Sequence, residues 1–368
     1  MTRPMKRALV VFAITSLLGL VAVIFVARTA WRYGDRPGGS ARGPVTVEIP
    51  SGASAGEVAE RLAQGGLIGN AAVFRLYAGQ RGVAGRFKAG RYEIVAPASP
   101  RQILDTLVKG AADELVAIVI PEGKNLVEIA EIFDAAGIAG KSALVGKSTD
   151  PGFAAELGLP GGSLEGYLFP DTYRMRPHTT PARVLIPLVR RHRQVFAELR
   201  AAHAKTVAEL KKTLGFDDNK IVVLASIVEK ETGRAEERPR IAQVFMNRLR
   251  MPTFSPKLLQ TDPTIIYGCT VGTPRSPACL KWDGRIRRIQ LEDRENPYNT
   301  YTHEGLPPGP ISNPGRAALE AVMAPDHTPY LYFVAKNDGS GSHYFSKSVA
   351  EHNAAVVKYQ RGGKPLAP

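Results

Sequence analysis

An uncharged run of twenty residues, Ala8–Ala27, constrains the architecture of this 368-residue chain more than any other feature. At about 1.5 Å per residue, a helix of this length spans about 30 Å, the hydrocarbon thickness of a bilayer. The run is longer than the apolar core of a signal peptide, and no small-x-small cleavage pattern follows it. We therefore expect an uncleaved, single-pass transmembrane helix at 8–27 behind a tail of residues 1–7, with the rest of the chain on one face of the membrane.

Composition places that remainder among ordinary globular proteins. Hydrophobic residues make up 44% and charged residues 22%, which argues against disorder, collagen and coiled coil. The two cysteines are too few for a Cys-rich zinc site and the seven histidines form no HExxH pattern, so we expect no metal and no cofactor. The net charge of +14 favours an anionic neighbour such as phospholipid, nucleic acid or an acidic polymer.

A strand, turn and helix pattern occurs twice, 71 residues apart. The sequence IPSG at 49–52 recurs as IPEG at 120–123, and EVAE at 57–60 recurs as EIAE at 128–131. Each copy opens with an alternating strand and continues with apolar residues at helical spacing. The repeat predicts a small α+β unit used twice, either for packing alone or for binding a ligand.

Glycine, proline and polar residues separate the uncharged run from the first copy. The segment GDRPGGSARGP at 34–44 is typical of a flexible tether, so we expect a linker at 28–44. The pattern of residues 45–113 predicts one compact βααβ-type module, and modules of this kind often bind glycan.

The sharpest local pattern is a helix that is apolar on every side. Residues 221–228, IVVLASIV, contain no charge, which predicts that this helix is buried all round. Glu229 follows directly, and the small Ala225 and Ser226 one turn back leave room for a ligand. Burial raises the pKa of a carboxyl group, which suits a general acid. The alternative is that Glu229 and Glu231 belong to a solvated, charged helix end.

Several polar and aromatic segments could supply a sugar-binding wall, since flat rings stack on sugars and polar tips bind hydroxyls. They are EGYLFPDTY at 165–173, QTDP at 260–263 and PYNTY at 297–301, and packed loops have the same composition. The candidate substrate-binding residues are Glu165, Tyr167, Asp171, Ser226, Glu231, Gln260, Thr261, Asp262, Tyr298, Asn299 and Tyr301.

A series of motifs resembles one known family. IPxG…EVAxxLxxxGLI, EGYLFPDTY, LASIVEKET, LQTDPTIIYG, NPYNTY, GLPPGPISNPG and TPYLYFVA occur in this order behind one N-terminal run. The chain thus resembles the MltG-type (YceG-like) endolytic murein transglycosylases over residues 45 to 355. The segment from Cys269 to Arg288 is longer and more basic than this family leads us to expect.

The resemblance implies an α+β protein with a LysM-like glycan-binding module at 45–113, a catalytic domain at 114–360 and a tail at 361–368. It implies a catalytic role for Glu229. It also implies the periplasmic face of the inner membrane, with the N-terminal tail inside. The implied partners are peptidoglycan glycan strands, the inner membrane and peptidoglycan synthases of the penicillin-binding type. A periplasmic location excludes nucleic acid.

In the implied reaction, one carboxyl group breaks the β-1,4 bond between N-acetylmuramic acid and N-acetylglucosamine of nascent strands without water, which ends glycan elongation. A hydrolase usually needs a second carboxylate, and Glu165, Asp171, Glu231 or Asp262 could provide it. A muramidase and a non-enzymatic wall-binding scaffold therefore stay open. A pyridoxal-dependent lyase is disfavoured because no lysine lies in a recognisable cofactor site.

Nine residues separate the two cysteines, in a segment that would face an oxidising compartment. We therefore expect a disulfide between Cys269 and Cys279.

Overall fold

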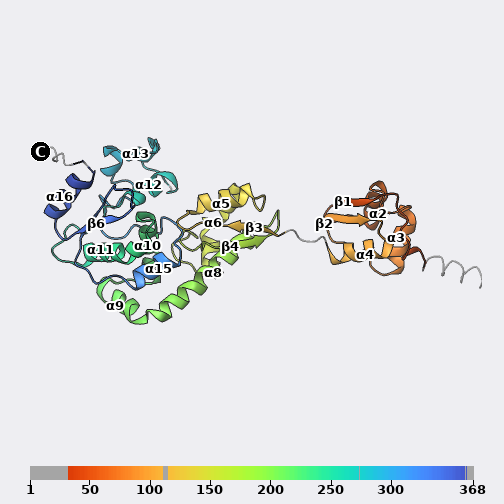
Figure 1. Cartoon of the computed structure of the whole chain (residues 1–368), viewed down its shortest axis with the longest axis horizontal. Helices are drawn as coiled ribbons and strands as arrows, with labels where there is room; N and C mark the ends of the chain where they lie inside the picture. The colour runs from red at the N-terminus through yellow and green to blue at the C-terminus, as the bar shows by residue number, and fades with distance from the viewer. Residues whose placement is uncertain (1–31, 111–114, 273, 361, 363–368) are drawn as a thin grey trace, which may run out of the picture. The chain divides into compact units, whose positions relative to one another are not determined.

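The computed structural model describes residues 32–110, 115–272, 274–360 and 362. The expected transmembrane helix at 8–27, the tail at 1–7 and nearly all of the C-terminal tail lie outside these residues. Within the described ranges, no helix combines the length and apolarity needed to cross a bilayer. The chain divides into two compact units, residues 1–114 and 115–368, and both combine helices with small antiparallel sheets, as expected for the α+β class (Figure 1).

The first unit follows the predicted order of strand, two helices and strand, with one more helix. Its elements are β1 (Gly43–Ile49), α2 (Ala55–Gln64), α3 (Ala71–Gln80), β2 (Gly90–Ala96) and α4 (Pro100–Lys109). Strands β1 and β2 pair antiparallel, and their alternate side chains join apolar residues of the three helices in one core. Hydrophobic periodicity along each element accounts for this arrangement.

The segment 34–44 is not a free tether, which corrects the expected linker. The N–H of Arg101 in α4 donates to the carbonyl oxygen of Gly34 at 2.9 Å. A side chain at Gly39 would collide with the carbonyl oxygen of Gly66. Glycine therefore serves here for close backbone contact rather than for flexibility.

The second unit opens with the same arrangement. Strand β3 (Val116–Val119) pairs antiparallel with β4 (Thr172–Met175), as β1 does with β2. Between and after these strands lie α5 (Leu126–Ala135), α6 (Lys141–Ser148), α7 (Pro151–Glu156) and α8 (Pro181–Ala202). The repeat, predicted from one strand and one helix, thus covers both strands and all three helices of the first unit, and the second copy has α7 in addition.

Both copies begin their first helix with the same cap. Ser54 accepts the N–H of Glu57 while Glu57 accepts the N–H of Ser54, and Asn125 and Glu128 form the same reciprocal pair. Such a capping box satisfies backbone donors that the first helical turn leaves free. The two copies therefore share local structure as well as sequence.

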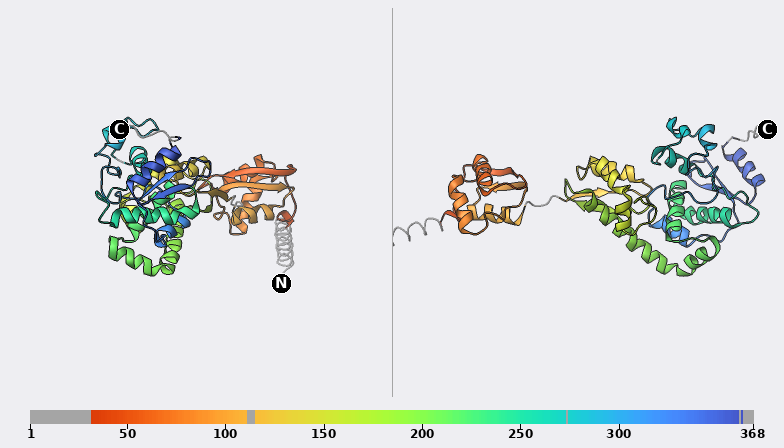
Figure 2. Two further views of the ribbon diagram at one scale, coloured as in Figure 1. Left: turned by 60° about the vertical axis from the view of Figure 1, so that its left-hand side comes forward. Right: turned by 180° about the vertical axis from the view of Figure 1, so that it is seen from behind.

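The remainder of the second unit is mainly helical (Figure 2). Its elements are α9 (Ala204–Leu214), α10 (Asp218–Glu231), the 3-10 helix η1 (Ala235–Glu237), α11 (Arg238–Arg250), α12 (Asp262–Thr270), α13 (Pro277–Leu280), α14 (Arg288–Leu291), α15 (Arg316–Met323), β5 (Tyr332–Ala335), β6 (His343–Ser346) and α16 (Val349–Gln360). Helix α10 packs against α11, α12 and α15. Residues 221–228 are all buried, as their composition predicts.

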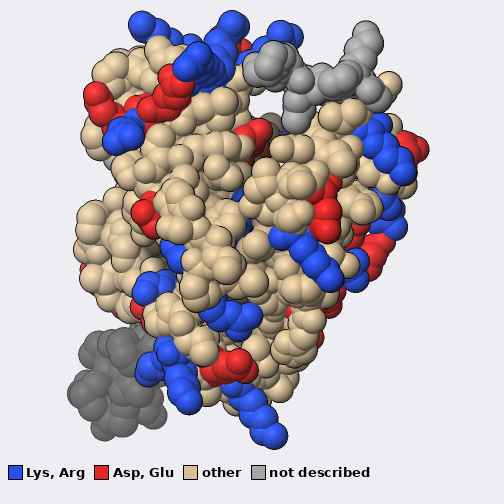
Figure 3. Space-filling model, turned by 90° about the vertical axis from the view of Figure 1, so that its left-hand side faces the viewer, with Lys and Arg blue, Asp and Glu red and all other residues tan. Residues whose placement is uncertain are grey.

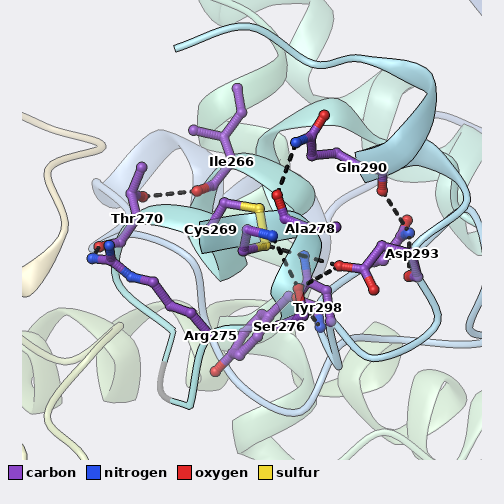
Figure 4. The surroundings of a disulfide bond; sticks show 12 residues. Ile266, Cys269, Thr270, Arg275, Ser276, Ala278, Gln290, Asp293 and Tyr298 are labelled. Atoms are coloured by element: carbon purple, nitrogen blue, oxygen red, sulfur yellow. Dashed lines mark hydrogen bonds between the residues drawn. A yellow bond between two sulfur atoms is a disulfide. The ribbon is translucent and has the colours of Figure 1, made fainter. Parts of the chain in front are cut away.

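The expected disulfide between Cys269 and Cys279 is present, and it joins α12 to α13 (Figure 4). Both cysteines are buried, and Ser276 caps α13 by accepting the N–H of Cys279 at 3.2 Å. Gln290 of α14 donates to the carbonyl oxygen of Ala278 at 2.9 Å. The described residues of this segment, 269–272 and 274–288, are therefore a structured part of the second unit.

Candidate active site

Glu229 lies in the last turn of α10. Asp217 caps the start of this helix by accepting the N–H of Lys220 at 2.8 Å, and the backbone is extended again at Thr232. Only 4% of the Glu229 side chain is exposed. The expectation of a buried carboxyl group at the end of a buried helix is therefore confirmed in geometry.

Two donors hold the carboxylate of Glu229. A terminal nitrogen of Arg238, the first residue of α11, lies 2.9 Å from Oε1. The N–H of Gly315, directly before α15, donates to Oε2 at 2.9 Å. The Arg238 side chain is itself only 9% exposed, so the ion pair is shielded from solvent.

The pKa of Glu229 is raised above its ordinary value. Burial is the largest cause, because it disfavours the charged form, and a nearby carboxylate, Glu122, acts in the same direction. The N–H of Gly315 and the guanidinium of Arg238 act against it. Glu229 can thus hold a proton at higher pH than an ordinary glutamic acid, and it is stabilised when it loses that proton.

Glu122 also lies in this site, although it is not among the residues predicted from the sequence. It lies in the IPEG turn of the second copy, and its Oε2 is 3.8 Å from the same Arg238 nitrogen that contacts Glu229. About half of the Glu122 side chain, 48%, is exposed. The one signal in the sequence is that the first copy has Ser51 at the matching position.

Two glycines allow this close arrangement. A side chain at Gly315 would collide with the carboxyl group of Glu122. Gly123 has a φ of +73°, and a Cβ there would lie 3.3 Å from Cγ of Glu229. Both positions bring backbone close to the acidic side chains.

Glu165 is an interior residue rather than part of a sugar-binding wall, which corrects its expected role. It accepts hydrogen bonds from the N–H of Leu126, from Tyr267 at 3.1 Å and from Asn313 at 2.8 Å. Burial raises the pKa of Glu165 to about 8, although these donors favour the charged form. The motif's aromatic and acidic composition could not distinguish this packed loop from an exposed one.

The other two residues of that motif also have structural partners. Tyr167 is buried, and its hydroxyl donates to Asn219 at 2.8 Å. Asp171 forms a half-exposed ion pair with Arg191 at 2.9 Å. Tyr167 lines a cavity of about 360 Å³ at the start of α10, about 15 Å along the helix from Glu229.

Ser226 is fully buried and does not face an open site, contrary to expectation. Its hydroxyl donates to the carbonyl oxygen of Val223 at 2.7 Å and accepts the N–H of Ile311 at 3.0 Å. Ser226 thereby ties the loop that precedes Gly315 to α10.

Another group of predicted residues does come together beside the end of α10. Thr261 donates to the buried carboxylate of Glu231, and Tyr301 donates to the exposed Asp262 at 2.7 Å. Burial raises the pKa of Glu231. The backbone of Gln260 donates to Thr300, and the residue is exposed.

These residues lie on a different side of α10 from Glu229. Two positions along a helix correspond to about 200° of rotation, so Glu231 and Glu229 point in nearly opposite directions. The structure therefore separates Glu231 and its partners from the Arg238 ion pair.

Asn299 and Tyr298 are framework residues. The Nδ2 of Asn299 donates to the carbonyl oxygens of Gln290 and Asp293 at 3.0 and 2.7 Å. The Tyr298 ring packs on that of Tyr267, with centroids 4.8 Å apart. Asn299 is fully buried.

Two further features bear on possible ligands: groups of metal-binding side chains and patches of like charge. Among the residues that the structure describes, no group of three or more His, Cys, Asp and Glu side chains could hold a metal ion. On the face of the molecule in Figure 3, basic and acidic side chains are interspersed. The positive net charge is thus not gathered into a single patch on that face.

Comparisons with known proteins agree with this architecture. A family model described as the YceG-like family matches residues 47–358. A Bacillus subtilis protein named endolytic murein transglycosylase is 32% identical over 331 residues, which cover 86% of this chain and 84% of that protein. A Streptococcus pneumoniae protein of the same name is 30% identical over 345 residues, and this match covers 86% of this chain but 58% of that protein.

A solved structure is also similar. The crystal structure of a YceG-like protein from Listeria monocytogenes has a TM-score of 0.53 and 32% sequence identity, and the match covers 85% of this chain and 99% of that chain. Fold and site together define a class of protein: an α+β protein with a buried glutamate in the last turn of a buried helix. The chain belongs to the YceG-like family.

Proposed function

We propose that this chain is an endolytic lytic transglycosylase of peptidoglycan that cleaves the β-1,4 bond between N-acetylmuramic acid and N-acetylglucosamine. The observation that carries the proposal is Glu229, a buried carboxyl group with a raised pKa and two fixed donors. The names of the Bacillus and Streptococcus relatives support the same activity.

The reaction needs one carboxyl group that first gives and then takes a proton. Protonated Glu229 donates to the leaving glycosidic oxygen as the bond from that oxygen to C1 of the muramic acid breaks. The Glu229 carboxylate then removes the proton of the sugar's own 6-hydroxyl, and O6 bonds to C1 to close a 1,6-anhydro ring. No water is consumed, and Glu229 ends with its proton restored.

The surroundings of Glu229 suit both steps. Burial favours the protonated carboxyl group that the first step needs. After proton transfer, Arg238 and the N–H of Gly315 stabilise the carboxylate until it accepts the next proton. The carboxyl group is also held in one orientation throughout.

A muramidase is the second candidate function, because Glu122 supplies a further carboxylate beside Arg238. Glycosidases that use water commonly place two carboxyl groups about 5 to 9 Å apart. In that reaction the second group would activate water or attack C1, and the product would have a free reducing end instead of an anhydro ring.

The location and wider role follow from the same proposal. We place the transmembrane helix at residues 8–27 in the inner membrane, the soluble part in the periplasm, and a LysM-like glycan-binding module at 45–113. Tethering would restrict the enzyme to glycan near the membrane, where synthases release new strands, and cleavage there would end strand elongation.

Mass spectrometry of purified glycan strands tests the activity. The full chain should generate 1,6-anhydro-muramic acid ends within strands, and Glu229→Gln should abolish them. Glu236→Gln is a matched control, because Glu236 is exposed and paired with Arg234. Reducing muramic acid ends would instead indicate hydrolysis, and intact strands that bind the protein would indicate a scaffold.

A further inference from the structure

The carboxyl groups of Glu122 and Glu229 share one guanidinium. The same terminal nitrogen of Arg238 lies 2.9 Å from Glu229 and 3.8 Å from Glu122. Glu229 and Arg238 are almost fully shielded from solvent, whereas Glu122 is half exposed. The guanidinium thus lies between an inner and an outer acid.

The turn that carries Glu122 is fixed from two sides. The N–H of Gly123 donates to the carbonyl oxygen of Asn313 at 3.1 Å, and the N–H of Asn313 donates back to Lys124 at 2.9 Å. The ammonium group of Lys230, on α10, donates to the carbonyl oxygen of Gly123 at 3.2 Å. The turn is therefore tied both to α10 and to the loop that precedes α15.

Glycine at 315 brings the two acids to the same piece of backbone. The N–H of Gly315 contacts the carboxylate of Glu229, and its Cα faces the carboxyl group of Glu122 closely enough to exclude a side chain. The turn at Glu122, the end of α10 and the segment at Gly315, which are far apart in sequence, thus meet around the carboxyl groups of Glu229 and Glu122.

The turn itself does not require an acid. The first copy forms the same turn with Ser51, which is exposed, and Gly52 has a φ of +80° where Gly123 has +73°. A glutamate at the second copy's turn is therefore unnecessary for local folding. Its position beside Arg238 suggests a different reason for its presence.

Charge balance supplies that reason. A shielded guanidinium is costly unless a carboxylate neutralises it. When Glu229 is ionised it neutralises Arg238, but when Glu229 carries the proton needed for catalysis it no longer does so. In the part of the chain that the structure describes, Glu122 is the other carboxylate that pairs with Arg238.

We propose that Glu122 is a positioning residue that neutralises Arg238 while Glu229 is protonated, and thereby keeps Glu229 in its acid form. This role rests on the proposed function, in which Glu229 is a general acid. Glu122 acts through Arg238 and Glu229 and needs no contact with the sugar.

The other charged groups around Glu229 do not replace Glu122. Arg238, from α11, favours ionised Glu229. Lys230 follows Glu229 on α10 and is bound to Gly123. Lys124 is paired with Glu128 at 2.6 Å, so their charges offset one another. The negative charge of Glu122 raises the pKa of Glu229.

The test is Glu122→Gln, which keeps the size of the side chain and removes its charge. Ionisation of Glu229 then becomes easier, so the alkaline limb of the kcat/KM profile should move to lower pH by about one unit, with about a tenfold loss of activity above that limb. Activity well below the limb should be retained. Glu131→Gln is the control, because Glu131 lies in the same copy but forms a surface pair with Lys141.

A second measurement needs no substrate. NMR titration of the Glu229 carboxyl carbon should show a lower pKa in the Glu122→Gln full chain than in the wild type, and Glu122→Asp should recover part of the difference. An unchanged Glu229 pKa in folded Glu122→Gln would overturn the proposal. Absence of glycan cleavage by the wild type would instead count against the proposed function, and the titration would still report on Glu122.

Discussion

Asn313 donates a hydrogen bond from its Nδ2 to Oε1 of Glu165 at 2.8 Å, in the interior of the second unit. The same Asn313 exchanges backbone hydrogen bonds with the turn that carries Glu122, and its side-chain oxygen accepts the N–H of Leu168 at 2.7 Å. Through Asn313, the EGYLFPDTY motif therefore contacts the turn that carries Glu122 from the interior of the second unit.

Glu229→Gln should lower glycan cleavage by at least about 100-fold, because it removes the titrating proton while it preserves size and polarity. Glu231→Gln should have a milder effect, since Glu231 points to another side of α10 and contacts Thr261. Initial rates of anhydro-end formation measure both. A larger loss in Glu231→Gln would reassign the acid.

Glu165 should make stability depend on pH. The pKa of Glu165 in the folded chain, about 8, lies above the ordinary 4.5. Between these two pH values the folded chain therefore keeps a proton that the unfolded chain releases. The free energy of unfolding should therefore fall by a few kcal/mol as pH rises from about 5 to 8. Urea melts across this range measure the slope.

Glu165→Gln should flatten that slope, and Glu156→Gln, at an exposed position, should leave it unchanged. A slope in Glu165→Gln equal to that of the wild type would show that other groups cause the pH dependence.

Gly315→Ala should destabilise the second unit by about 0.5 to 1.5 kcal/mol, because the new methyl group displaces the half-exposed carboxyl end of Glu122 from its place beside Arg238. Removing the obstacle should restore stability, so the double variant Gly315→Ala with Glu122→Ala should melt closer to Glu122→Ala alone. Thermal melts of the four proteins in this cycle measure the coupling. Purely additive losses would mean that the collision is relieved elsewhere.

Reducing the bond between Cys269 and Cys279 should cost about 2 to 3 kcal/mol by loop entropy, because the bond joins residues 10 positions apart. Thermal melts with and without reductant measure this loss. Thiol labelling of native, unreduced protein should find neither sulfur reactive, and quantitative labelling of both would contradict the bond.

The N-terminal boundary of the first unit gives another prediction. The Tyr33 ring packs edge-on against Tyr77 at 5.7 Å, and Asp35 pairs with Arg101 at 3.0 Å. A chain that begins at residue 32 should therefore be more stable than one that begins at 43, by about 1 to 3 kcal/mol. Equal melting of the two truncated chains would show that segment 34–44 contributes nothing.

Local patterns were sufficient to predict several elements. The repeated strand, turn and helix followed from periodicity and turn residues, and the buried helix that has Glu229 in its last turn followed from eight uncharged residues. The disulfide was expected from two cysteines in one segment, given the compartment that the resemblance implies. Each feature depends on residues close together in the sequence.

Sequence alone determined which helix is buried and that Glu229 follows its apolar run, because an unbroken apolar run is a property of neighbouring residues. Only the tertiary structure decided what surrounds that carboxyl group. Glu122, Arg238 and Gly315 lie in a turn, at a helix start and before another helix, and nothing local distinguishes them from other residues of their kinds. Their chemistry arises from shared burial and mutual distance, which packing of distant segments sets.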